Sequence, residues 1–207
     1  FWNGKYYVSP GYQGKPDDRA QALAVVSGVL PKELYPVIRP FFSTWYHASP
    51  YMEKYVLEAL CTMGYYQDAL NRMKLRYRAM IESPLTTLWE GWGIGSEGFG
   101  GGTYNHAWSG GPLTILSQYI AGIETLEPAF RMFRVAPHPP LSGGRRIVFE
   151  MDKSAHSGTM YLRVPEGTSA QVVLPAEFQH WSVNGEPKNE RQLTLSAGEW
   201  HFEMSEK

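Results

Sequence analysis

The sequence has very little cysteine, and this scarcity limits its chemistry. Cys61 is the only cysteine in 207 residues, so no disulfide can form within the chain. The closely spaced cysteines of a structural zinc site are missing as well. No spacing of His, Asp and Glu indicates a metal site, and we predict neither a metal nor a cofactor. The fold therefore depends on its hydrophobic core.

The sequence also lacks an excess of one charge and a long apolar run. Lys and Arg number 19 against 20 for Asp and Glu, which gives a net charge of -1, and no basic stripe is present that would neutralise phosphates. No apolar segment approaches the roughly 20 residues of a membrane helix. We expect no nucleic-acid partner and no membrane span, and we expect a soluble chain of either cytoplasm or periplasm.

Aromatic residues, in contrast, are abundant. They make up 14% of the chain, with 7 Trp and 13 Tyr, and many stand beside glycine. Exposed rings suit carbohydrate, because the C–H face of a pyranose packs flat on an aromatic ring; an aromatic core is the alternative. The chain begins at Phe1 without a leader pattern, and we interpret it as a piece of a longer protein.

The first half of the sequence has helical periodicity. A helix is expected between the capping acid Asp17 and Gly28, and another between the Ser49-Pro50 cap and Gly64. Two prolines allow only separate helical turns over residues 32–43. A third helix, over 66–82, follows Gly64 so closely that the two form an antiparallel hairpin.

A fourth helix is expected after the Gly110-Gly111-Pro112 sequence. Its apolar side is predicted to hold four residues, namely Leu113, Leu116, Ile120 and Ile123. The apolar face of the third helix is predicted to end with Met80 and Ile81.

From about residue 128 the pattern changes to short alternating runs. We expect strands over 159–164, 170–174 and 192–195, with turns at 165–167, 184–185 and 197–198. This spacing is typical of an antiparallel β-sandwich. Its inward-facing bulk would come from Trp181, Val183, Trp200 and Phe202. The predicted fold class is thus α plus β, with helical hairpins over residues 1–127 and the sandwich over 128–207.

The glycine-rich stretch over residues 83–112 is the strongest candidate for a functional site. Its tryptophans carry too much apolar surface for a disordered segment, so we interpret it as an active-site wall. Glu90 stands next to Trp89 and near Trp92, an apolar setting that raises a carboxyl pKa and suits acid or base catalysis. A structural role in capping a helix is the alternative. Glu97, among glycines, is expected to face solvent.

His106 is a second candidate. Its imidazole can donate to a sugar hydroxyl or, alternatively, be satisfied by loop carbonyls. Ser109 has no nearby acid and does not form a nucleophile elbow. Glycines 100–102 lack the Lys and Ser/Thr of a phosphate-binding loop.

Two motifs in this stretch resemble a known family. The sequence Ser-Pro-Leu-Thr-Thr-Leu-Trp-Glu (83–90), followed by Asn-His-Ala-Trp-Ser-Gly (105–110), resembles the end of the catalytic domain of bacterial α-L-rhamnosidases, glycoside hydrolase family 78. Residues 164–175 and 183–185 resemble the β-sandwich that follows that domain. The resemblance covers nearly the whole chain and identifies it as a C-terminal portion.

The resemblance implies an (α/α)6 barrel that hydrolyses terminal α-L-rhamnosides with inversion. Glu90 would be the general base that activates water, and His106 would contact the sugar. The general acid would lie upstream of Phe1, so the missing N-terminal part is an expected partner and the isolated chain is expected to be inactive. The family more often follows Asn-His with Tyr-Ala-Tyr-Gly, which leaves the preferred sugar open.

Further substrate contacts are predicted from four neighbours of these residues, namely Trp89, Trp92, Asn105 and Trp108. Two other functions remain possible at this point. In one, the chain is a carbohydrate-binding module whose sandwich, with Trp181 and Trp200, binds sugar while the helices are scaffold. In the other, the barrel catalyses a lyase or phosphorylase reaction, although a phosphorylase needs a cationic anion-binding site near Glu90.

Overall fold

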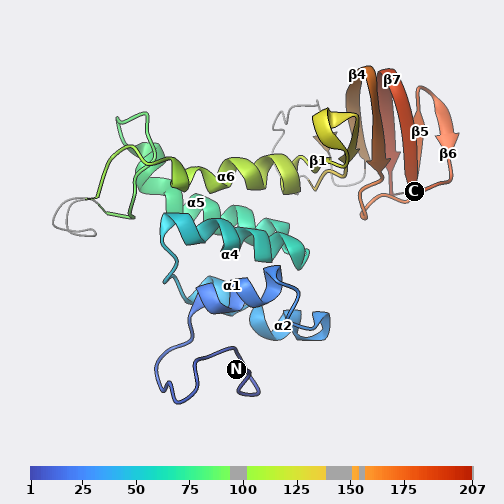
Figure 1. The fold of residues 1–207 in the computed structure, drawn as a ribbon. Coiled ribbons are helices and arrows are strands. Elements are labelled where there is room, and N and C mark those ends of the chain that lie inside the picture. Colours follow the sequence, from blue (N-terminus) through green and yellow to red (C-terminus); the bar gives the residue numbers. More distant parts are fainter. Residues whose placement is uncertain (94–101, 139–150, 154–156, 207) are drawn as a thin grey trace. The chain divides into compact units, whose positions relative to one another are not determined.

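The computed structural model describes residues 1–93, 102–138, 151–153 and 157–206. The chain divides into two compact units, the helical Phe1–Ile115 and the mainly β-stranded Leu116–Lys207 (Figure 1). The protein is therefore α plus β, as its sequence predicts. A compact unit need not coincide with a domain of a longer protein, so the boundary between residues 127 and 128 stays a prediction.

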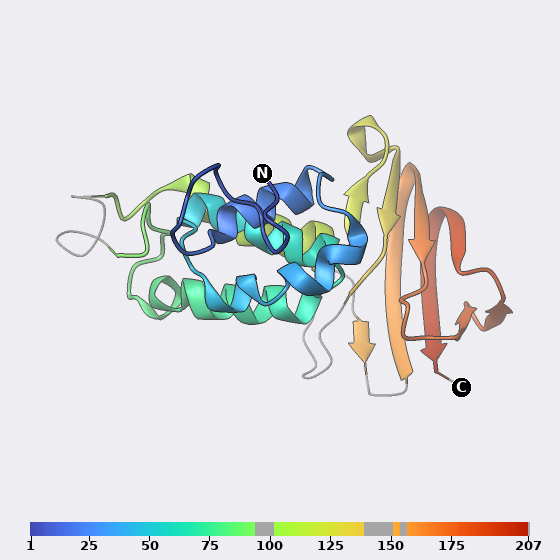
Figure 2. The same ribbon diagram turned by 90° about the horizontal axis from the view of Figure 1, so that it is seen from below.

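The helical unit is built around three helices that lie side by side, α1, α4 and α5 (Figure 1 and Figure 2). Its helices are α1 (Asp18–Val26), α2 (Tyr35–Ile38), α3 (Phe41–Thr44), α4 (Pro50–Thr62), α5 (Tyr66–Glu82) and α6 (Gly111–Thr114), with 3-10 turns η1 (Lys32–Leu34) and η3 (Ala107–Gly110). The interrupted helical turns of residues 32–43 and the hairpin of α4 and α5 are confirmed.

The helix ends follow the capping residues. The Asp17 side chain accepts from the backbone N–H of Arg19 before α1, and Ser49 Oγ accepts from that of Met52 at 3.4 Å in α4. Gly28 and Gly64 follow the last turns with φ of +73° and +85°, which glycine adopts without strain. Local sequence thus determines where these helices begin and end.

Part of the predicted apolar faces is wrong. Ile81, Leu113 and Leu116 are 74%, 72% and 41% exposed. After α6 the chain continues as a π-helix, η4 (Ile115–Ile120), and its wider turn changes which side chains share a face. Ile120 is buried as predicted and Ile115 is buried as well, whereas Ile123 lies in a β-strand and not in the helix.

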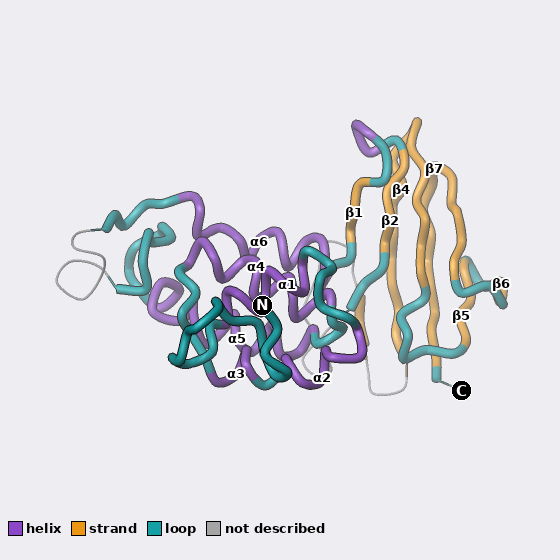
Figure 3. Tube along the Cα trace, turned by 60° about the horizontal axis from the view of Figure 1, so that its bottom comes forward, coloured by secondary structure: helices purple, strands orange, loops and turns teal. Residues whose placement is uncertain are grey.

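The second unit contains a seven-stranded mixed sheet in the order β1-β2-β4-β7-β5-β6, with β3 also paired to β4 (Figure 3). The strands are β1 (Ile123–Thr125), β2 (Met132–Val135), β3 (Met151–Lys153), β4 (Ser157–Val173), β5 (His180–Val183), β6 (Glu186–Lys188) and β7 (Gln192–Ser205), with a 3-10 turn η5 (Pro128–Phe130). The pairing of β2 with β4 is parallel and the others are antiparallel. The expectation of a purely antiparallel arrangement is wrong.

Two of the predicted turns are instead one β-bulge. Val164 pairs with Gly198 and Ser169 pairs with Ser196, so residues 165–168 stand opposite residue 197 alone. Both long strands continue through this point, because the extra residues bulge out without reversing the chain. Two strands pair with the same edge of β4. β3 pairs with residues 158–160, before the bulge, and β2 pairs with residues 169–172, after it.

One face of the sheet is buried, in the alternation the sequence predicts. Phe202 is fully buried, Trp181 is 4% exposed, and their rings stack at 5.9 Å between centroids. Val183 is buried, and Trp200 is partly buried with Nε1 donating to the Ser196 carbonyl. The Asn184-Gly185 turn between β5 and β6 is confirmed, with φ of +52° and +81°. The described strands all belong to one sheet, so the sandwich stays a prediction.

Candidate active site

Two segments of the glycine-rich stretch pair with each other through their backbones. The Glu90 N–H donates to the Thr103 carbonyl and the His106 N–H donates to the Leu88 carbonyl, both at 2.9 Å. This antiparallel pairing brings together two residues that are 16 positions apart in the sequence, Glu90 and His106. Ser109 is buried and its hydroxyl donates to the Trp89 carbonyl, which gives it a structural role.

The Glu90 carboxylate is held through one oxygen. Its Oε2 accepts from the backbone N–H of Thr103 at 2.8 Å and from the Thr103 hydroxyl at 3.3 Å. His106 Nδ1 lies 3.7 Å from the same oxygen. A Cβ on Gly102 would lie 3.3 Å from it, so glycine lets the backbone approach the carboxylate closely. Within the described part of the chain, Oε1 has no hydrogen-bond partner and the side chain is 28% exposed.

A row of aromatic rings begins at His106. The His106 and Trp108 rings lie 4.1 Å apart and the Trp108 and Tyr51 rings lie 5.6 Å apart. Trp108 Nε1 donates to the backbone carbonyl of Glu90 at 3.2 Å, which holds the indole against the backbone of that residue. Trp108 and Tyr51 are 43% and 45% exposed. Both are therefore partly open to solvent, Trp108 at the backbone of Glu90 and Tyr51 one ring further along the row.

The other predicted contacts are distributed differently. The Trp89 ring packs edge-on against Tyr104. The Trp92 ring packs against Tyr77 and also lies under the Arg76 guanidinium. Cζ of Arg76 is 4.1 Å from the centre of the indole ring. Asn105 is exposed. Trp92 therefore anchors the stretch to α5, whereas His106 and Trp108 are the predicted residues that lie at Glu90.

Two residues of this site were not predicted from the sequence. Thr103 joins Glu90 to His106, and Tyr51, in the first turn of α4, extends the aromatic row. The position of Tyr51 directly after the Ser49-Pro50 cap was a usable signal, because a residue at a helix entrance can face a cleft. Glu97 lies outside the described residues.

Neither a metal site nor a membrane span is found where the structure describes the chain. No group of three or more His, Cys, Asp and Glu side chains there is arranged to bind a metal ion. Among the same residues, no helix is both long and apolar enough to cross a bilayer.

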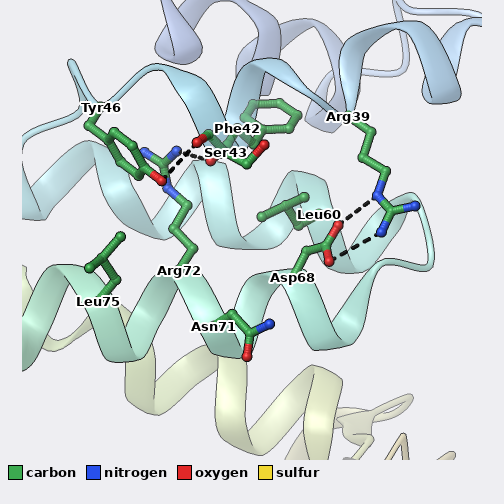
Figure 4. A pocket seen from close by; sticks show the side chains of 9 residues that line it. All are labelled: Arg39, Phe42, Ser43, Tyr46, Leu60, Asp68, Asn71, Arg72 and Leu75. Carbon is green, nitrogen blue, oxygen red and sulfur yellow. Dashed lines mark hydrogen bonds and ion pairs between the residues drawn. The ribbon is translucent and has the colours of Figure 1, made fainter.

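A separate pocket of about 180 Å³ lies between α3, α4 and α5 (Figure 4). Its two guanidinium groups already have carboxylate partners. Arg39 pairs with Asp68 at 2.7 Å, and Arg72 pairs with Asp18 and Glu53. None of the predicted site residues lines this pocket, and we assign no ligand to it.

Comparison with known sequences gave no match, either to a protein-family model or to a curated protein. Comparison with solved structures did. The α-L-rhamnosidase of Dictyoglumus thermophilum is similar with a TM-score of 0.76 and 19% identity, over 99% of this chain and 27% of that one. That of Streptomyces avermitilis, solved with L-rhamnose, gives 0.72 and 18%, over 96% and 22%.

A fungal structure agrees with these two. The α-L-rhamnosidase of Aspergillus terreus has a TM-score of 0.68 and 16% identity, over 96% of this chain and 25% of that one. The chain thus spans about a quarter of the length of these proteins. It shares the fold of one portion of the α-L-rhamnosidases, and the resemblance predicted from its sequence is confirmed at that level.

Proposed function

We propose that this chain is the C-terminal part of an inverting α-L-rhamnosidase in which Glu90 is the general base. The observation that carries the proposal is the carboxylate of Glu90, which is held through Oε2 beside His106 while Oε1 has no partner among the described residues. A base must be fixed in position and must also keep one oxygen available to water. The fold shared with α-L-rhamnosidases supports the substrate class.

The reaction needs a second carboxyl group. Inverting glycosidases place an acid about 6.5–9.5 Å from the base, so that one protonates the glycosidic oxygen while the other deprotonates water on the opposite face. Asp18 and Glu53 cannot be that acid, because both are fully buried and paired with Arg72. As the family resemblance implies, we expect the acid to come from the N-terminal part of the same enzyme.

The substrate would contact the residues around Glu90. The exposed faces of Trp108 and Tyr51 offer apolar surface to the C–H face of a pyranose. His106 and the amide of Asn105 can form hydrogen bonds with sugar hydroxyls. Trp89 and Trp92 would support these residues from behind, through Tyr104 and α5.

The helical unit would form part of an (α/α)6 barrel, and the sheet unit would form the following β-sandwich. Three exposed apolar side chains of the helical unit support the incomplete barrel, namely Leu75, Ile81 and Leu113, which are 59%, 74% and 72% exposed. We expect the missing helical hairpins to cover these side chains, and the isolated chain to associate and lack activity.

The alternative function is that of a carbohydrate-binding module. It relied on Trp181 and Trp200 as exposed rings of the sandwich, but Trp181 is 4% exposed and Trp200 is partly buried. The sheet unit does expose Phe130 and Tyr161, but the exposed rings of Trp108 and Tyr51 form a row that begins at Glu90 and His106. This distribution favours the enzyme.

The proposal is tested by co-expressing this chain with the segment that precedes it in its parent protein and assaying an aryl α-L-rhamnoside. Glu90→Gln should lower kcat by about 10²- to 10⁴-fold, the usual contribution of a general base. Glu82→Gln makes the same change in an exposed ion pair of α5 and should leave kcat within about twofold. Proton NMR of the first product formed should show the inverted anomer.

Three outcomes count against the proposal. Retention of configuration would exclude the inverting mechanism. Unchanged turnover in Glu90→Gln would remove its catalytic role, and sugar binding without turnover would favour the binding module.

A further inference from the structure

The hydroxyl of Thr103 lies between the Glu90 carboxylate and the His106 imidazole. Thr103 Oγ1 is 3.3 Å from Glu90 Oε2 and 3.0 Å from His106 Nδ1. The direct separation of Nδ1 and Oε2 is 3.7 Å, which is too long for a hydrogen bond. The two side chains are therefore joined through this hydroxyl.

The chemistry of the three groups determines the direction of the link. A carboxylate only accepts hydrogen bonds, whereas a hydroxyl donates one and also accepts. If Thr103 donates to Glu90, its oxygen accepts from His106, and Nδ1 must carry a hydrogen. The reverse order would leave the Thr103 and Glu90 oxygens facing each other at 3.3 Å without a hydrogen between them, which is unfavourable.

We propose that Thr103 is a positioning residue that couples His106 to Glu90 by accepting from His106 Nδ1–H and donating to Glu90 Oε2. The neutral imidazole is then held as the Nδ1–H tautomer, and its Nε2 lone pair is available to a sugar hydroxyl. Glu90 receives two hydrogen bonds from Thr103 on one oxygen, which leaves Oε1 available to a water.

The direction of the hydrogen bonds does not depend on catalysis, whereas the roles of Nε2 and Oε1 rest on the proposed function. The backbone bond from Thr103 N–H to Glu90 Oε2, at 2.8 Å, survives any change of the Thr103 side chain. Removing the hydroxyl should therefore release the imidazole while one anchor of the carboxylate remains.

Two substitutions separate the hydroxyl from the shape of the side chain. Thr103→Val keeps the branched shape and loses the hydroxyl, whereas Thr103→Ser keeps the hydroxyl. The full 207-residue chain is labelled with ¹⁵N-histidine, and long-range ¹H–¹⁵N NMR at neutral to mildly alkaline pH identifies which ring nitrogen of His106 carries the hydrogen. We expect mainly Nδ1–H in the unaltered chain and in Thr103→Ser, and a clear shift toward Nε2–H in Thr103→Val.

The tautomer of the unaltered chain is decisive even if a variant does not fold. A predominant Nε2–H form there overturns the proposal, and so does an unchanged tautomer in a folded Thr103→Val. In the co-expressed enzyme, Thr103→Val should lower kcat/KM by about 10- to 100-fold, the scale of a misplaced catalytic group, and Thr103→Ser should restore most of it. An enzyme without rhamnosidase activity would refute the proposed function while leaving the tautomer result intact.

Discussion

Arg72 on α5 and Glu53 on α4 form a buried ion pair, with 2.6 Å between Nε and Oε1. The guanidinium also donates to Asp18 of α1 at 2.5 Å and to the carbonyls of Phe42 and Trp45. Burial lowers the pKa of Arg72, but the hydrogen bonds and negative charges of Glu53 and Asp18 outweigh burial and raise it overall. One side chain thus joins three helices.

Removal of this guanidinium should strongly destabilise the helical unit. In Arg72→Met, the buried carboxylate of Asp18 loses its counter-charge and that of Glu53 keeps only Arg76, at 3.5 Å. Breaking a buried pair in this way costs about 3–5 kcal/mol. The free energy of unfolding is measured in urea, through amide NMR signals of α4.

The matched control lies on the exposed face of the same helix. Arg78 pairs with Glu82, and their side chains are 72% and 63% exposed, so Arg78→Met should cost less than about 1 kcal/mol. If Arg72→Met and Arg78→Met lower the free energy of unfolding equally, the buried network contributes no more stability than the exposed ion pair.

The sequence could not reveal this network, although it predicted the helices that carry it. The Ser49-Pro50 cap and Gly64 specify the ends of α4 locally, whereas charged residues within amphipathic helices normally face solvent. Asp18 stands at the expected capping position beside Asp17, yet it is fully buried. Its burial depends on Arg72, which lies 54 positions away.

The site was predictable to the same extent. The motifs named both Glu90 and His106, and the backbone pairing of their segments brings these two residues together, while their roles stay predictions. Thr103 has no distinctive neighbours in the sequence, so its place between them depends on that pairing alone. The bulge at residues 165–168 was missed for a related reason, because Pro165 and Gly167 indicate a turn when the partner strand is unknown.

The stability of the sheet unit should decrease in mild acid because of His138. Burial lowers the pKa of His138 below its ordinary value of 6.5, and this effect outweighs the hydrogen bond to the Tyr119 carbonyl and the charge of Glu177. The unfolded chain therefore binds a proton more readily than the folded one. This contribution is fully present above pH 6.5 and is lost as the pH falls toward the lowered pKa of the folded state.

The measurement compares the unaltered chain with His138→Gln. Urea unfolding is followed through amide NMR signals of β4 and β7 between about pH 7.5 and pH 5.5, the range around an ordinary histidine pKa. The variant should show a smaller loss of unfolding free energy over this range. An identical pH dependence in both chains would exclude His138 as its source.

Among the glycines of the sheet unit that the structure describes, Gly122 should tolerate substitution least. Its φ of +69° is strained for other residues, and a Cβ would lie 1.9 Å from the Ala136 carbonyl oxygen, which belongs to the backbone. Gly167 has a similar φ of +76° but has no atom within 4 Å of a Cβ position. Gly167→Ala should therefore lower the free energy of unfolding only by the strain of a left-handed alanine, about 1–2 kcal/mol.

Gly122→Ala should lose at least a further 1–3 kcal/mol, the usual cost of overpacking, because the hydrogen bond from Ala136 N–H to the Gly122 carbonyl holds the two segments at 2.9 Å. The free energy of unfolding of both variants is measured through the same amide signals of β4 and β7. Since the two positions share the backbone conformation, the difference between the variants isolates the steric clash. If both variants lose the same free energy of unfolding, the segments at Gly122 and Ala136 can move apart without cost. That outcome would contradict the prediction that their close approach excludes a side chain at Gly122.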